Sequence, residues 1–93
     1  MNVSGKEAVP RLAPGCRMGV GEGRDEMLLV PEGALRMRGP VRMILERCDG
    51  QRTVGVIIDE LCQLFPSENR TRIENEVTEL LAHLHRRGAI ELA

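Results

Sequence analysis

The chain has 93 residues, of which 42% are hydrophobic and 29% charged, and its formal net charge is −1 at pH 7. A chain of this length forms one small domain with one modest hydrophobic core. Phe65 is the sole member of the Phe, Tyr and Trp class, which excludes base stacking on aromatic platforms and an aromatic cage for a cation. The near-neutral charge offers no general attraction to nucleic acid.

No segment of the sequence predicts a secretion signal or a membrane span. Residues 1–9 hold no apolar run, and no stretch approaches the roughly 20 apolar residues that cross a bilayer. We therefore expect a cytoplasmic protein without a membrane partner. Cys16, Cys48 and Cys62 are odd in number and widely spaced, so we expect reduced thiols and no zinc site.

The first part of the chain reads as a tail followed by short strands. Residues 1–9 have no apolar period, and we interpret them as a mobile tail before a single domain of residues 10–93. Glycines and prolines then separate three strand-forming runs, at residues 16–20, 27–30 and 34–38. This punctuation predicts a three-stranded antiparallel meander.

The third run has the clearest two-residue alternation. Leu35 and Met37 are expected on the core face, and Ala34, Arg36 and Arg38 on the solvent face. Neighbouring N–H groups of a strand point to opposite sides, so Arg36 and Met37 cannot both donate to the same neighbour. We expect Met37 to be the residue whose backbone supports the sheet, because its side chain also faces the core.

The apolar period lengthens after Gly39-Pro40, which predicts helices. Pro40 opens the first, Thr53 caps the second, and Asp49-Gly50 and Pro66 end them. The expected apolar stripes are Val41, Ile44, Leu45 and Cys48 in the first helix, and Val54, Ile57, Ile58, Leu61 and Phe65 in the second.

A third helix is predicted from the pattern Thr71-x-x-Glu74, which has the form of a capping box. Gly88 closes this helix, and residues 89–92 add a short terminal strand. The apolar side of the third helix is formed by Ile73, Val77, Leu80, Leu81 and Leu84. Three strands followed by three helices predict an α+β domain of winged-helix-like architecture.

No catalytic constellation is present in the sequence. His83 and His85 lie two residues apart on the third helix, roughly 200° around its axis, so they cannot share a metal. Gly21-x-Gly23 lacks the third glycine and the following helix of a phosphate loop, and a turn is the better interpretation. We therefore expect no enzyme activity, no bound metal and no cofactor.

Charges are unevenly distributed along the chain. Residues 36–52 hold five arginines against two acidic residues, whereas residues 59–79 hold six acidic residues against two arginines. A winged-helix nucleic-acid-binding protein is an alternative function, but its third helix would bring three glutamates to the phosphates. A purely structural subunit is a further alternative, and both charge clusters have a plain role in solubility.

Three sequence elements together resemble the PqqD family, the small accessory proteins of pyrroloquinoline quinone biosynthesis. They are Pro-Glu-Gly-Ala-Leu-Arg-Met at residues 31–37, Ile-Leu-Glu-Arg-Cys-Asp-Gly-Gln-Arg-Thr-Val at residues 44–54, and Ile-Ile-x-x-Leu at residues 57–61. The resemblance extends over residues 10–92. The chain departs from the family pattern at Cys16 and near Val20, where the family has aromatic residues, and at Met37-Arg38, where it has Leu-Asn.

The resemblance implies a non-catalytic peptide chaperone, similar to the recognition domains of peptide-modifying systems. It would bind a short precursor peptide and present it to a radical S-adenosylmethionine enzyme. The peptide would pair with the edge of the third strand, in a groove between that strand and the third helix. The peptide-binding residues implied are Gly33, Ala34, Leu35, Arg36, Met37, Arg38, Ile73, Val77 and Leu81.

The same strand edge has a consequence for assembly. A strand edge without a partner is a template for pairing with another chain. Together with glycines at residues 19–23 and a hinge at Arg38-Gly39-Pro40, it leads us to expect a homodimer or strand exchange at high concentration.

Overall fold

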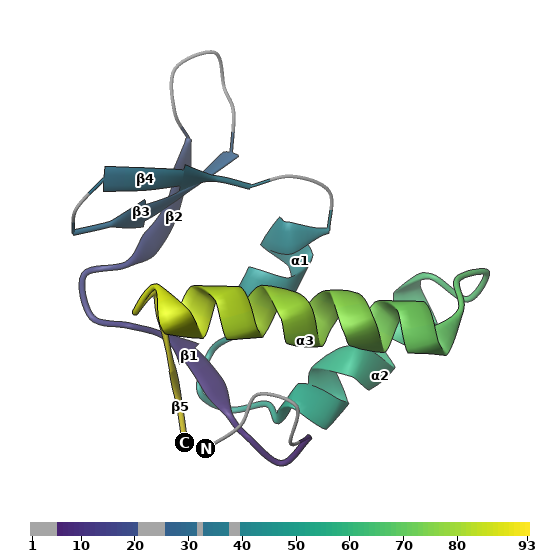
Figure 1. Cartoon of the computed structure of the whole chain (residues 1–93). Helices are drawn as coiled ribbons and strands as arrows, with labels where there is room; N and C mark the ends of the chain where they lie inside the picture. Colours follow the sequence, from purple (N-terminus) through teal and green to yellow (C-terminus); the bar gives the residue numbers. More distant parts are fainter. Residues whose placement is uncertain (1–5, 21–25, 32, 38–39) are drawn as a thin grey trace.

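The computed structural model describes residues 6–20, 26–31, 33–37 and 40–93 (Figure 1). The elements in chain order are β1 (Pro10–Leu12), β2 (Arg17–Val20), β3 (Glu26–Val30), β4 (Gly33–Arg36), α1 (Val41–Glu46), α2 (Val54–Leu64), α3 (Arg70–Arg86) and β5 (Ile90–Leu92). The predicted α+β class, with a three-stranded antiparallel sheet and three helices, is confirmed. No helix of the described ranges is both long and apolar enough to span a membrane.

The three-stranded sheet has the order β2-β3-β4, with antiparallel pairing throughout. Leu35 is half-buried and Met37 buried, while Ala34 and Arg36 are exposed, so the predicted alternation holds; Arg38 lies outside the described residues. Glycine in β2 has a packing reason, because a Cβ on Gly19 would lie only 2.9 Å from Leu29 Cδ1. The residue that weakens the strand signal in the sequence is thus the one that lets the two strands pack.

A second, two-stranded sheet joins β1 to β5 and pairs Pro10 with Leu92. The terminal strand was predicted, but β1 was not, because three residues beginning with proline carry little strand signal. The pairing continues beyond β1, since Val9 N donates to Ala93 O at 3.1 Å and Ala93 N to Val9 O at 3.0 Å.

The predicted tail is packed against the domain over the part that the structure describes. Val54 N donates to Ala8 O at 2.8 Å, and Gly55 N to Lys6 O at 3.0 Å, at the start of α2. Ala8 is buried. The predicted boundary at residue 10 is therefore wrong for residues 6–9, which form part of the domain; residues 1–5 lie outside the described residues.

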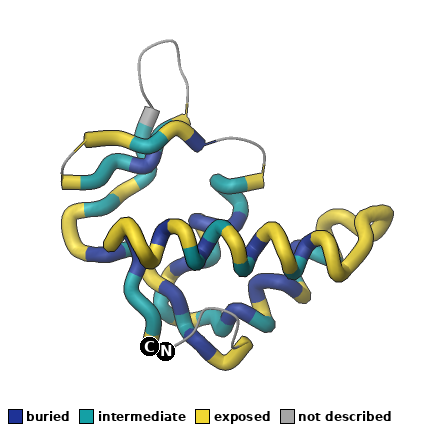
Figure 2. The backbone as a smooth tube through the Cα atoms, in the orientation of Figure 1, coloured by how far each residue is buried: buried dark blue, intermediate teal, exposed yellow. Residues whose placement is uncertain are grey.

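The hydrophobic core lies between the helices and the inner face of the sheet (Figure 2). The predicted stripes of all three helices supply most of it, and Thr53 caps α2 as expected, its Oγ1 accepting from Val56 N at 3.1 Å. Phe65 differs from the prediction: it lies at the C-cap of α2 with 37% of its surface exposed. The single aromatic residue of the chain is thus not part of the buried core.

The start of α3 also differs from the prediction. Asn69 is the N-cap, and its Oδ1 accepts from Thr71 N at 2.8 Å and from Arg72 N at 3.4 Å. The capping box from Thr71 to Glu74 is wrong, because Thr71 already lies in the first turn. Glu74 instead forms an ion pair with Lys6 at 3.0 Å.

Exchange of the capping residue tests this assignment. We expect Asn69→Ala to lower the free energy of unfolding by about 1 kcal/mol, because two N–H groups of the first turn lose their acceptor. Thr71→Ala is the matched control and should change it by less than about 0.5 kcal/mol. Urea unfolding followed by circular dichroism measures both; a larger loss for Thr71→Ala would restore the capping box.

Candidate functional site

β4 is an edge strand of the three-stranded sheet, and one hydrogen bond fixes how its backbone is oriented. Met37 N donates to Glu26 O at 2.9 Å, so this N–H points toward β3. By alternation the Leu35 N–H also points toward β3, and the N–H groups of Ala34 and Arg36 point to the opposite side. The prediction that the backbone of Met37 supports the sheet is confirmed.

The structure separates the residues predicted from the family resemblance into two groups. Gly33 to Arg36 form β4, and Met37 follows it in the core. Ile73, Val77 and Leu81 are buried on the inner side of α3 and belong to the same core cluster as Met37. Leu81 has no exposed surface, so its role is packing.

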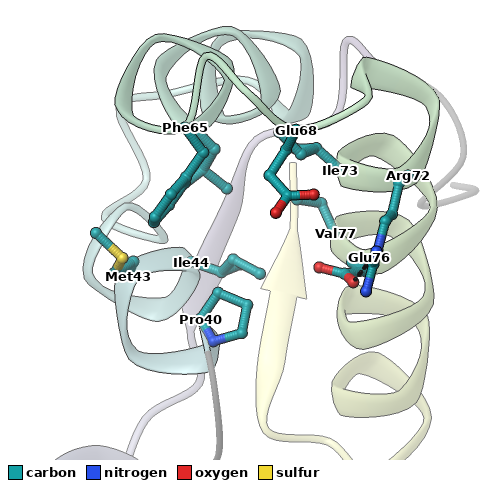
Figure 3. Close-up of a pocket in the computed structure, with 10 residues that line it drawn as sticks. Pro40, Met43, Ile44, Phe65, Glu68, Arg72, Ile73, Glu76 and Val77 are labelled. Carbon is teal, nitrogen blue, oxygen red and sulfur yellow. Dashed lines mark hydrogen bonds and ion pairs between the residues drawn. The ribbon is translucent and has the colours of Figure 1, made fainter.

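A cavity of about 410 Å³ opens between α1, the end of α2 and the first half of α3 (Figure 3). Ile73 and Val77 line it, and Leu81 is absent from its lining. Among the described residues, none from β4 lines it, so the cavity lies beside the predicted groove and not within it. The full lining is Pro40, Met43, Ile44, Leu61, Phe65, Glu68, Arg72, Ile73, Glu76 and Val77.

The cavity has an apolar floor and a charged rim. Arg72 Nε lies 3.3 Å from Glu76 Oε1, and both side chains are largely in solvent, as is Glu68. Such a site accepts apolar side chains and orients them with polar groups at its mouth. Sequence reasoning missed it except for Ile73 and Val77, and the one available signal was an aromatic residue placed just before Pro66.

No cluster of three or more His, Cys, Asp or Glu side chains forms a metal site within the described ranges. His83 and His85 are exposed on α3, as expected. Cys48 is buried, and its Sγ donates to Ile44 O at 3.3 Å. Burial, with the neighbouring Asp49 charge, raises the pKa of this thiol to about 12, which makes it a poor nucleophile.

Thiol alkylation tests the placement of Cys48. At about pH 8 we expect iodoacetamide to modify Cys48 more slowly than Cys16 and Cys62, which are half-buried, because its thiolate is scarce and inaccessible. Peptide mass spectrometry measures the three rates, with the denatured chain as control. Equal rates in the folded protein would contradict the buried site.

The Asp-Gly-Gln-Arg-Thr element at residues 49–53 builds the turn between α1 and α2. The carboxylate of Asp49 accepts from Gln51 N at 2.9 Å and forms an ion pair with Arg52. Arg52 also reaches Glu60 on α2 at 3.1 Å, and Arg47 at the end of α1 contacts the same carboxylate at 3.0 Å. The element therefore helps to hold the two helices in place.

This turn also makes stability depend on pH. The Gln51 N–H, with the Arg52 charge, lowers the pKa of Asp49 below its ordinary value of 3.8. The folded state then binds the proton less readily than the unfolded state, so the contribution of Asp49 is present above that value and is lost as pH falls through the folded pKa.

Melting temperatures measured between about pH 6 and about pH 3 test this linkage. We expect the domain to lose stability on acidification, and Asp49→Asn to lose less, because it has no carboxyl to protonate. Glu79→Gln, at an exposed position on α3, is the control for the loss of one surface carboxylate. A variant Asp49→Asn that follows the acid-induced decline of the parent would refute the assignment.

The comparisons with known proteins agree with this fold. The family model described as Coenzyme PQQ synthesis protein D (PqqD) matches residues 26–90, from β3 into β5. The chain belongs to the PqqD family. The departures at Cys16 and Val20 lie outside the segment that matches the PqqD model.

Curated relatives of PqqD type cover most of the chain. A protein of Rahnella aquatilis named PqqA binding protein is 32% identical over 77 residues, which span 82% of this chain and 79% of that protein. One of Xanthomonas axonopodis pv. citri with the same name is 30% identical over 88 residues, which span 94% and 95%.

A solved structure of a PqqD domain is similar to this chain over most of its length. It is the solution NMR structure of the PqqD truncation of Methylobacterium extorquens PqqCD, described as a functional, stand-alone recognition element for ribosomally synthesized and post-translationally modified peptides. The TM-score is 0.73 at 30% identity, and the match covers 89% of this chain and 88% of that one.

Proposed function

We propose that this PqqD-family domain binds a PqqA-type precursor peptide along the outer edge of β4 and serves as a peptide chaperone in pyrroloquinoline quinone biosynthesis. The observation that carries the proposal is the orientation of β4 in a chain of this family. The bond from Met37 N to Glu26 O directs the N–H groups of Ala34 and Arg36 away from β3. An extended peptide can pair with that side of a strand, and alternate side chains then set its register.

The charge of the strand favours an acidic peptide. Arg36 is exposed on the solvent face of β4, and we assign Arg36 and Arg38 the role of attracting acidic residues of the peptide to this edge. Charges at the rim of a binding site act mainly on the association rate and its salt dependence. Ile73 and Val77, which line the neighbouring cavity, complete the peptide-binding surface.

The role is non-catalytic, and the chemistry belongs to a partner. In this proposal the domain holds no cofactor, acts in the cytoplasm and presents the peptide to a radical S-adenosylmethionine enzyme. In the absence of peptide, the β4 edge is the surface through which two copies associate into a homodimer.

The nucleic-acid-binding alternative has a specific observation against it. The arginines at the start of α3 are paired with carboxylates: Arg70 with Asp59 at 2.6 Å and Arg72 with Glu76 at 3.3 Å. Arginines engaged in this way contribute little toward phosphate groups, and the comparisons favour peptide binding.

A proline exchange at the edge tests strand addition. Ala34→Pro removes an N–H that points away from β3, so we expect a folded domain whose affinity for the peptide falls by at least about tenfold. Ala34→Ser is the matched control, because it keeps this N–H, and it should bind as the parent does. Calorimetric titration with a synthetic PqqA peptide measures affinity, and circular dichroism measures folding.

The complementary variant acts on the other side of the strand. Met37→Pro removes the donor to Glu26 and a buried side chain, so we expect it to lower the free energy of unfolding by about 2–5 kcal/mol. If Ala34→Pro is folded and binds the peptide as tightly as Ala34→Ser, strand addition at β4 is wrong.

A further inference from the structure

The cavity beside α3 has room for more than one side chain and an aromatic residue at its mouth. Its volume of about 410 Å³ is well above the roughly 150 Å³ of a cavity that binds benzene. Phe65, the single aromatic residue, lines this cavity with 37% of its surface exposed. The exposed part of this ring is available to a side chain that enters the cavity.

One end of the cavity is formed by a residue that follows β4 closely in the sequence. Pro40, three residues after Met37, lines one end of the cavity, and Phe65 lies at the other end (Figure 3). A peptide strand that follows β4 toward its C-terminal end therefore reaches the cavity at Pro40. The two surfaces are successive parts of one path along the domain.

After Pro40 the surface that faces the peptide is formed by helices and no longer by a strand, and this constrains the peptide backbone. Pro40 has no N–H, and its carbonyl accepts from Ile44 N at 3.1 Å as α1 begins. Beyond this point the walls are helices, which offer no strand edge, so a peptide strand finds no neighbouring strand to pair with. Over an apolar floor, its N–H and C=O groups need partners within the peptide itself, which a helical turn supplies.

We propose that the precursor peptide is recognised in two successive conformations: extended along β4, then as a short helical turn over the cavity, with two apolar side chains three or four residues apart inserted between α1 and α3. This inference rests on the proposed function. Residues at that spacing lie on one face of a helix, and the remaining faces of the turn meet the charged rim of Glu68, Arg72 and Glu76. Apolar anchors in a groove are the usual signature of helix recognition.

Separate substitutions of two neighbouring residues at the end of α2 test whether the cavity binds the peptide. Phe65→Ser should weaken binding of a synthetic PqqA peptide by about tenfold, because it removes the ring that covers an anchor. Leu64→Ser is the matched control: Leu64 is even more exposed, at 47%, but does not line the cavity, so binding should change by less than about twofold. Met43→Gln, which alters the wall formed by α1, serves if Phe65→Ser fails to fold and should weaken binding in the same way.

The peptide side of the experiment distinguishes a helical turn from a continued strand. In an alanine scan of the peptide, substitution at two apolar positions spaced by three or four residues should weaken binding to the parent domain. The same substitutions should have little further effect on binding to the Phe65→Ser variant. NMR of labelled peptide should show helical shifts at these positions and extended shifts in the segment before them. Sensitive positions spaced by two residues would overturn the helical turn.

The two proposals fail in different ways. If Phe65→Ser and Met43→Gln bind the peptide as the parent does, while folded Ala34→Pro does not, the cavity inference is wrong and strand addition stands. If the parent domain itself does not bind the synthetic PqqA peptide, both are wrong.

Discussion

Met37 is held by its backbone and by its side chain, and the arrangement of the proposed binding surface depends on both. Its N–H donates to Glu26 O on β3, and its side chain is buried in the core formed with the helices. The first contact decides which N–H groups of β4 point away from the sheet, and the second ties the sheet to the helical part. Because α1 begins only four residues later, at Val41, the same residue also fixes where the wall of the cavity begins.

Features set by neighbouring residues could be predicted from the sequence. The alternation of β4, the cap at Thr53 and the glycine that ends α3 each depend on a few adjacent positions. The predicted end of α1 at Asp49-Gly50 is wrong, because α1 ends at Glu46 with Arg47 as its C-cap. Asn69 was missed because two residues of capping type lie close together, and only the geometry of the first turn decides between them. β1 was missed because its partner β5 lies about 80 residues away and its own three residues carry almost no signal.

The surfaces that form the proposed binding site could be predicted less completely, for a physical reason. A strand is a property of one segment, so residues 34–38 could be predicted as a strand from their alternation, whereas their peptide-binding role was implied by the family resemblance. The cavity exists only where α1, α2 and α3 meet, and its depth depends on how the helices pack. The residue pattern of Ile73 and Val77 is the same for a core position and for a cavity wall, and here both residues serve both roles. The Asp-Gly-Gln-Arg-Thr element is the opposite case, because its distinctive sequence builds a turn between two helices.

The pairing of β1 with β5 brings the two ends of the folded domain together. Val9 and Ala93 are hydrogen-bonded to each other, and Figure 1 places this pair at the far end of the molecule from β4. A second protein joined at either end would thus leave the strand edge and the cavity open. The solved relative, a truncation of PqqCD, is a domain excised from a longer chain. In this chain, the paired strands β1 and β5 and the proposed peptide-binding strand β4 lie at opposite ends of the domain.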